Sequence, residues 1–202
     1  RGVRCVLVSA PAGFGKTTLV VDSVRASKLP FAWLALDEDD NELLRFWRYI
    51  VAGLESIDSR IGAGLRPALY AAQTPAIQEI ITGMINDIAS FEKEMIFVLD
   101  DYHLIEAPAI HDSLNYLLDH LPPQLSLVII TRSDPPLNLA RRRGRGQMIE
   151  FRANDLRFSQ GESAAFLNQT MQLELSSADI ASLAQRTEGW IAGLQMAALA
   201  LH

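Results

Sequence analysis

The residues best suited to chemistry lie near the start of the chain, in the segment Ala10–Thr18. Its small residues let the backbone curl, so that successive N–H groups point at one centre. A helix is predicted to begin there, and its N-terminus adds positive potential. This spacing is typical of a phosphate-binding P-loop. The residues predicted to contact a nucleotide are Ala12, Gly13, Phe14, Gly15, Lys16, Thr17 and Thr18.

Two side chains of this loop have specific predicted roles. Lys16 would neutralise charge on the β- and γ-phosphates of ATP or GTP, and the Thr17 hydroxyl would coordinate Mg²⁺. The usual pattern opens with glycine, whereas this chain has Ala10, which fits if its φ is negative. The alternative interpretation is an ordinary loop between a strand and a helix.

A pair of carboxylates, Asp100 and Asp101, follows the apolar run Met95–Leu99. In open α/β sheets, ligands bind at the carboxyl ends of the strands. We therefore expect Asp100 to hold Mg²⁺, and Asp101 to orient or deprotonate an attacking water. The alternative is that the two acids only cap a helix.

Arg132 ends the next predicted strand and is placed to reach a γ-phosphate, although it fits a surface arginine as well. The run Arg141–Arg145 has three open interpretations. It is a solvated helix face, a finger reaching into a neighbouring subunit, or a contact to nucleic acid. His103 is expected to be a structural hydrogen-bonding residue rather than a catalyst.

Apolar stretches alternate with helical patterns as far as residue 151, and strands are predicted at 3–9, 31–36, 95–99, 125–131 and 147–151. This alternation predicts a parallel sheet covered on both faces, which is a three-layer α/β fold. The acidic cluster 37–40 is predicted to cap the following helix, and Thr74–Pro75 to begin another. Three tryptophans are expected in the core, namely Trp33, Trp47 and Trp190.

The pattern changes after residue 151, where helix-capping signals replace strands. Ser159 with Glu162, and Ser176 with Asp179, have the spacing of capping boxes. We therefore predict a P-loop nucleotide-binding domain at 1–154 and the start of a small helical, lid-like subdomain at 155–202.

Composition narrows the class of protein. Apolar residues make up 49% of the 202 and charged residues 21%, as in ordinary globular domains. No apolar run reaches the roughly 18 residues that span a bilayer, and the net charge of −6 opposes nucleic-acid binding over the whole surface. The single cysteine, Cys5, is expected in the core, which fits a reducing cytoplasm. The chain opens on Arg1 within a predicted strand, so we expect a piece of a longer protein.

Several strings resemble the MalT-like family of large ATP-binding, LuxR-type transcriptional regulators, members of the STAND class and relatives of the AAA+ fold. Besides the P-loop, they are Trp33–Asp37, Asp100–Ile105, Thr131–Pro136, Leu156–Ser159 and Glu188–Trp190. The resemblance implies strand order 5-1-4-3-2, with a helical subdomain beside the nucleotide. It assigns Lys16, Thr17, Asp100, Asp101 and Arg132 the roles given above. Relatives place a nucleotide-contacting Gly-x-Pro where this chain has Gly189 and Trp190 with no proline.

The resemblance implies a slow ATPase switch that binds ATP or ADP with Mg²⁺ and self-associates when ATP is bound. In such regulators the switch controls DNA binding, while inducer and DNA act through domains that this chain lacks, and no membrane is involved. The alternative is an assembly scaffold that binds ATP with little or no hydrolysis. A third interpretation is a metabolic kinase. Such an enzyme needs an acceptor pocket and a lid, and the sequence shows no candidate for either.

Overall fold

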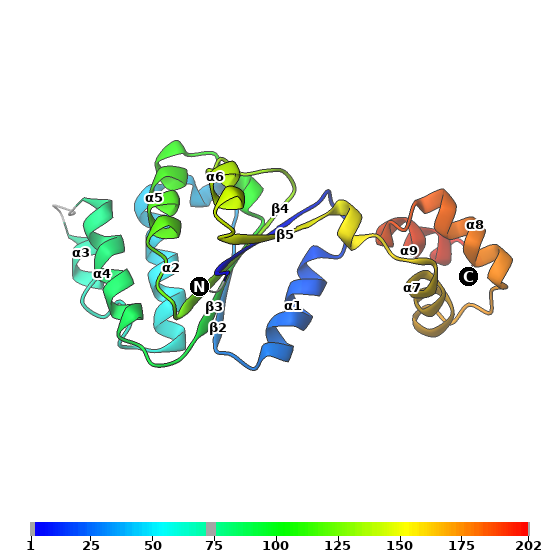
Figure 1. Cartoon of the computed structure of the whole chain (residues 1–202), viewed down its shortest axis with the longest axis horizontal. Helices are drawn as coiled ribbons and strands as arrows, with labels where there is room; N and C mark the ends of the chain where they lie inside the picture. The colour runs from blue at the N-terminus through cyan, green and yellow to red at the C-terminus, as the bar shows by residue number, and fades with distance from the viewer. Residues whose placement is uncertain (1–2, 72–75, 202) are drawn as a thin grey trace.

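The computed structural model describes residues 3–71 and 76–201, and its five parallel strands form one sheet (Figure 1). The strand order is β2-β3-β4-β1-β5, which read from the other edge is the expected order 5-1-4-3-2. The predicted helix start at Thr74–Pro75 lies outside the described residues. The strands are β1 Cys5–Ser9, β2 Phe31–Ala35, β3 Met95–Asp100, β4 Leu125–Thr131 and β5 Met148–Arg152.

Helices cover both faces of this sheet, which confirms the predicted three layers (Figure 1). On one face lies α1 (Lys16–Ser27). The other face carries α2 (Leu43–Ile57), α4 (Ile77–Ala89), α5 (Pro108–Asp119) and α6 (Leu139–Gly144), with α3 (Arg66–Tyr70) beside α2. Short 3₁₀ turns are η1 Glu38–Asn41, η2 Tyr102–Leu104 and η3 Ala153–Leu156.

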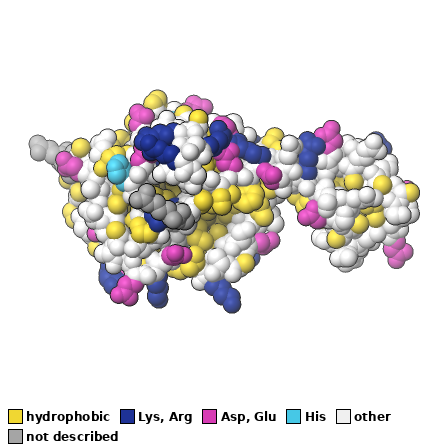
Figure 2. All heavy atoms as spheres, viewed as in Figure 1, with side chains coloured by type: hydrophobic (Ala, Val, Ile, Leu, Met, Phe, Trp, Pro, Cys, Tyr) yellow, Lys and Arg dark blue, Asp and Glu magenta, His cyan; other side chains and the backbone are white. Residues whose placement is uncertain are grey.

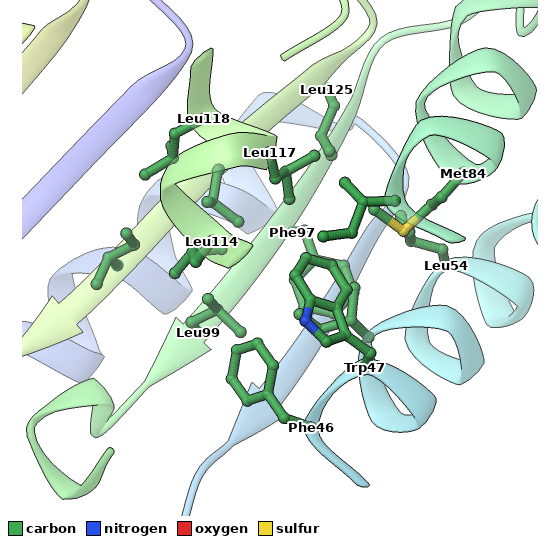
Figure 3. Packing of buried hydrophobic residues seen from close by; sticks show 14 of the residues in the cluster. Phe46, Trp47, Leu54, Met84, Phe97, Leu99, Leu114, Leu117, Leu118 and Leu125 are labelled. Atoms are coloured by element: carbon green, nitrogen blue, oxygen red, sulfur yellow. The ribbon is translucent and has the colours of Figure 1, made fainter. Parts of the chain in front are cut away.

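The central strand β3 shows why the sheet is stable. All six of its residues are buried, and alternate side chains enter two separate hydrophobic clusters. The larger cluster lies between the sheet and α2, α4 and α5 (Figure 3). Within it Trp47, Phe97 and Leu114 are fully buried, and the Trp47 indole N–H donates to the Ser113 hydroxyl at 2.9 Å. The prediction that Trp47 belongs to the core is confirmed.

The prediction that the acidic cluster 37–40 caps the following helix is wrong. Asp37 instead caps η1, where its carboxylate accepts from the Asp39 amide at 2.9 Å. The cap of α2 is Glu42, which accepts from the Leu44 amide at 3.0 Å. An aspartate bonds readily to the backbone just after it, so the cluster forms a turn of its own before the helix begins.

The chain beyond β5 forms α7 (Gln160–Ala164), a π-helical turn at Ala165–Thr170, α8 (Ser177–Thr187) and α9 (Ile191–Leu199). Both predicted caps are present, since the Ser159 and Ser176 hydroxyls accept from backbone amides three residues on. This part has its own hydrophobic cluster, made of Leu167, Leu173, Ile180, Leu194 and Ala198.

We propose two domains, 1–154 and 155–202, on the ground of that separate cluster. Leu156, just past the proposed boundary, still belongs to the cluster on the α1 face of the sheet. In Figure 1 a narrow connection at η3 joins the sheet to the helices that follow.

The surface is mixed in charge. On the face seen in Figure 2, basic side chains are interspersed with acidic ones rather than joined into one basic surface. None of the helices within 3–71 and 76–201 combines the length and the apolar character that crossing a bilayer requires. Cys5 is buried, as expected, and burial raises the pKa of its thiol to about 11.

Replacing Leu114 by alanine tests the larger cluster. Its side chain is fully buried, so Leu114→Ala should lower the free energy of unfolding by about 2–5 kcal/mol, through lost burial and the cavity left behind. Urea unfolding measures this. The matched control is Leu199→Ala, because Leu199 is 61% exposed and its loss should change stability little. Equal effects of the two substitutions would contradict the packing described.

Candidate functional site

The loop between β1 and α1 curls as a P-loop does. Gly13 and Gly15 both have positive φ, +79° and +73°, which favours glycine at these positions. Gly15 caps α1 without a side chain, so the first amides of the helix have no side-chain acceptor. Lys16 is buried, and its ammonium donates to the Pro11 carbonyl at 2.9 Å.

A cavity of about 250 Å³ opens at this loop. Its lining includes most of the residues predicted from the sequence, and they come from three separate parts of the chain. They are Ala12, Gly13, Gly15, Lys16, Thr17, Thr18, Asp101 and Arg132.

Thr17 and Asp100 bring two oxygen ligands side by side. The Thr17 hydroxyl donates to the Asp100 carboxylate at 3.2 Å, and the other carboxylate oxygen accepts from the Asp101 amide at 2.9 Å. Burial raises the pKa of Asp100, while the Asp101 amide, Thr17 and Lys16 oppose that rise. A hydroxyl and a carboxylate suit Mg²⁺, which usually takes few protein ligands and keeps water and phosphate oxygens. Across the described residues, no group of three or more His, Cys, Asp or Glu side chains forms a metal cage.

Asp101 has an unusual backbone for a residue with a side chain. Its φ of +54° lies in the left-handed region, and a non-glycine residue held there often marks a functional site. Its side chain is 45% exposed and faces the cavity, with the His103 Nδ1 at 3.7 Å from its Oδ1. That distance is too long for a hydrogen bond, and His103 Nδ1 has no hydrogen-bond partner among the described residues. Burial, then the charge of Arg132, lowers the pKa of His103.

Arg132 follows β4 and lies on the rim of the same cavity, with an exposed side chain. Burial lowers the pKa of Lys16, and the nearby charge of Arg132 lowers it further, whereas Asp101 and Asp100 raise it. Two cations that repel each other across a cavity are suited to a ligand with several negative charges.

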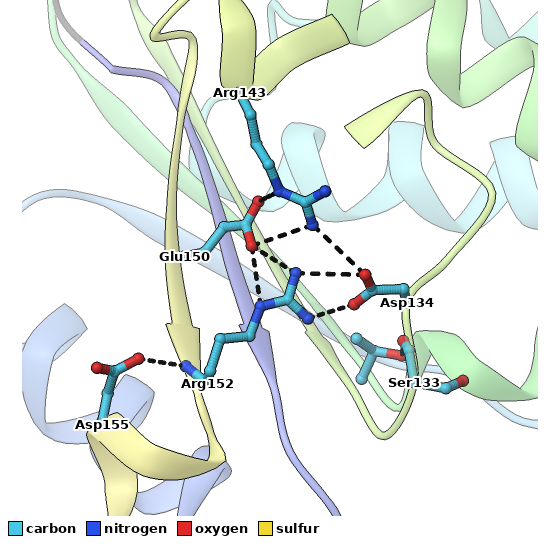
Figure 4. Close-up of polar contacts among 7 residues, drawn as sticks. Ser133, Asp134, Arg143, Glu150, Arg152 and Asp155 are labelled. Atoms are coloured by element: carbon cyan, nitrogen blue, oxygen red, sulfur yellow. Dashed lines mark hydrogen bonds and ion pairs between the residues drawn. The ribbon is translucent and has the colours of Figure 1, made fainter. Parts of the chain in front are cut away.

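A network of ion pairs holds the loop that follows Arg132 (Figure 4). Arg152 of β5 pairs with both Asp134 and Glu150. Arg143 of α6 pairs with the same two carboxylates. The network therefore joins the Arg132 loop to the strand that leads into the helical part of the chain.

The arginine run has a role that the three sequence-based interpretations did not include. Arg142 is buried, pairs with Asp119 at 3.1 Å and donates to the Leu137 carbonyl at 3.1 Å. Arg141 also contacts Asp119, at 3.4 Å. With Arg143 in the network, three arginines of the run bind acidic residues of this chain and fix α6 in place.

The start of α9 reaches back to the P-loop. The Trp190 indole N–H donates to the Ala12 carbonyl at 3.2 Å, and the Ala192 amide donates to the Gly13 carbonyl at 3.1 Å. Trp190 is therefore half-buried against the loop rather than a member of a core cluster. A second cavity, about 280 Å³, lies beside this contact, and Phe14 lines it instead of the first. Its lining is Pro11, Ala12, Phe14, Arg157, Thr187, Glu188 and Trp190.

Sequence reasoning missed two of these features. The hydrogen bond between Trp190 and Ala12 joins residues 178 positions apart, and no local sequence pattern predicts such a contact. The network around Asp134 likewise depends on the pairing of β5 with β1, although the alternating charges of Glu150 and Arg152 on one strand were a signal of a shared face.

The amino-acid sequence is similar to that of one group of known regulators. No family model matches it. It is 32% identical over 196 residues to the HTH-type transcriptional regulator MalT from each of two strains of Klebsiella pneumoniae. The match covers 97% of this chain and 22% of each relative, so the chain spans about a fifth of their length. The predicted resemblance is confirmed for that segment.

Solved structures share the fold. The Orc1 protein of Aeropyrum pernix, solved in complex with DNA, aligns with a TM-score of 0.53 at 16% identity and covers 85% of this chain and 44% of that one. Cdc6p from Pyrobaculum aerophilum aligns with a TM-score of 0.52 at 16% identity, covering 83% and 42%. The predicted fold class, a P-loop NTPase sheet, is therefore confirmed.

The ion-pair network predicts a dependence of stability on pH. The hydrogen bond from Arg152 holds the pKa of Asp134 below its ordinary value. The stabilisation is present above the unfolded-state pKa of about 4 and is lost as the pH falls through the lower pKa of the folded state. Asp134→Asn should remove about 1 kcal/mol or less at pH 7, because the pair is well exposed, and should weaken the acid dependence.

Urea unfolding at pH 7 and near pH 3 measures both effects. Asp112→Asn, which changes an exposed carboxylate outside the network, is the control. If the two variants lose stability equally between the two pH values, the network does not contribute as described.

Proposed function

We propose that this chain, a homologue of one segment of the MalT-type transcriptional regulators, binds ATP or ADP with Mg²⁺ and acts as a slowly hydrolysing regulatory switch. The observation that carries the proposal is the convergence of a P-loop, Asp101 and Arg132 on one cavity, with Asp100 bonded to Thr17 of the loop. The similarity to MalT supports a role in regulation, since MalT is an HTH-type transcriptional regulator.

Each residue has a role that follows from its position. The loop amides and Lys16 bind the β- and γ-phosphates, since both face the cavity. Thr17 and Asp100 hold Mg²⁺, which supplies charge neutralisation at the phosphates. Asp101 lies beyond them and orients or deprotonates the attacking water. Arg132 binds the γ-phosphate from the rim.

In the whole regulator, we expect ATP to favour self-association, and inducer and DNA to bind elsewhere in the protein. Two features of the described surface support this division. The net charge is −6, and three arginines of the basic run are paired with carboxylates of the chain. DNA binding needs free cations to neutralise backbone phosphates.

One observation favours the alternative, a scaffold that binds ATP with little hydrolysis. The Asp101 side chain is nearly half exposed, so the proposed base is not shielded from bulk water as bases in fast enzymes usually are. A rate too slow to detect in a single-turnover assay, with ATP bound, would decide for the scaffold.

Lys16→Ala should abolish nucleotide binding while the fold is retained. Among the described residues, the Lys16 ammonium donates to the Pro11 carbonyl alone, so its loss affects the phosphates more than the core. Isothermal titration with ADP is the measurement, with circular dichroism as the check of folding. Lys93→Ala removes an exposed lysine far along the chain and is the matched control. A folded Lys16→Ala protein with unchanged affinity would exclude the phosphate role.

Asp101→Asn should keep ATP binding and slow hydrolysis by about 10²–10⁴-fold, the usual value of general-base assistance. Asparagine tolerates the left-handed backbone at this position, so the loop should keep its shape. Single-turnover hydrolysis measures the effect, with Asp112→Asn as the control for loss of an exposed carboxylate. An unchanged rate would remove Asp101 from the mechanism.

A further inference from the structure

The outer side of the P-loop is bound by the helical part of the chain. In such a loop the amides turn inward toward the phosphates, which leaves carbonyl groups facing outward. Two of these carbonyls have partners at the start of α9. Ala12 accepts from the Trp190 indole N–H at 3.2 Å, and Gly13 accepts from the Ala192 amide at 3.1 Å.

The two parts are in close contact at this point. A Cβ atom at Gly13 would stand 2.6 Å from the Ala192 Cβ and 2.8 Å from the Trp190 Nε1, so neither could keep its place. Glycine at this position is therefore needed for the positive φ of the loop and also for the approach of α9. The loop and the helix determine each other's position.

The position of the Trp190 side chain is fixed from behind. Its backbone amide donates to the Thr187 carbonyl at 2.9 Å, and the preceding Gly189 carbonyl accepts from the Phe158 amide at 2.9 Å. A Cβ at Gly189 would stand 2.5 Å from the Phe158 carbonyl oxygen. The backbone at 187–190 is thus anchored to the beginning of the helical part, and the indole points from that anchor to the loop.

We propose that Trp190 is a positioning residue for the P-loop, and that nucleotide binding and docking of the segment 157–199 strengthen each other through it. The inference rests on the proposed nucleotide site. Trp190 does not line the cavity formed by Lys16 and Arg132, so it acts on the loop rather than on the phosphates. By holding the Ala12 carbonyl outward, it keeps the neighbouring amides directed at the ligand.

The coupling follows from the cost of ordering the loop. A loop with two glycines loses much conformational entropy when it is fixed in one shape. The binding of either the nucleotide or the segment 157–199 includes this entropic cost if it occurs first. The second partner then binds to a loop already in shape. Because linkage is reciprocal, the factor by which docking improves ADP affinity equals the factor by which ADP improves docking.

The test compares Trp190→Phe with the unmodified chain. Phenylalanine keeps an aromatic ring but has no N–H for the Ala12 carbonyl. Loss of one neutral hydrogen bond should weaken ADP binding about 2- to 10-fold in isothermal titration. Trp33→Phe is the matched control, since Trp33 is half-buried on β2 and makes no contact with the loop among the hydrogen bonds of the described residues.

A second measurement separates positioning from a merely structural role. Hydrogen exchange of the amides in 157–199 should slow when saturating ADP is added to the unmodified chain, and should slow less in Trp190→Phe. A structural role alone would raise exchange equally with and without ADP and leave the ADP affinity unchanged. The comparison of the unmodified chain with and without ADP needs no variant, so it tests the coupling between nucleotide binding and docking even if Trp190→Phe folds poorly.

The outcomes distinguish the two proposals. If the unmodified chain binds no ADP, the proposed function fails, and the coupling fails with it. If it binds ADP but exchange in 157–199 does not respond, or if Trp190→Phe binds ADP as tightly as Trp33→Phe does, only the positioning role of Trp190 is overturned.

Discussion

The order of three neighbouring strands determines where the residues of the candidate site come together. β4 lies between β1 and β3, and all three run parallel, so their carboxyl ends meet at one edge of the sheet. The loop after β1 carries Lys16 and Thr17, the end of β3 carries Asp100 and Asp101, and the end of β4 carries Arg132. Residues from three distant parts of the sequence thus reach one cavity because a parallel sheet has all its strand ends of one kind on one side.

Burial of the strand ends then gives these charges their properties. Asp100 and Lys16 are both buried, and burial shifts the pKa of each toward its neutral form. Each is also drawn back toward its charged form by the other. Opposite charges held together in this way suit a ligand that brings both phosphate anions and a divalent cation.

Two connections lead from this edge to the helical part of the chain. One runs through Asp134 and Arg152, which join the Arg132 loop to the end of β5 just before the chain leaves the sheet. The other returns from the far end of the helical part, where Trp190 and Ala192 contact the P-loop. A single stretch of chain at η3 links the two parts, so these side-chain and backbone contacts decide how strongly the helical part is docked on the sheet.

The amino-acid sequence by itself determined the elements and the chemical inventory. Local periodicity placed β4 at 125–131 without error, and the spacing of Ser159 with Glu162 and of Ser176 with Asp179 placed the starts of α7 and α8. The P-loop spacing predicted the residues that are proposed to bind phosphate. These features depend on residues close together in the chain. Even locally, the cap of α2 was assigned to the wrong residues, because the acidic cluster 37–40 and the true cap, Glu42, lie close together and look alike in sequence.

Only the tertiary structure decided which of these elements touch. The run Arg141–Arg145 had three open interpretations until the fold buried Arg142 against Asp119, and Trp190 was expected in the core, whereas it contacts the P-loop at the start of α9. Phe14 lines the cavity beside Trp190 rather than the one at Lys16, a placement that the sequence did not indicate. Such partners are set by how helices and strands pack across long separations in the chain, and a single sequence carries no local signal of that packing.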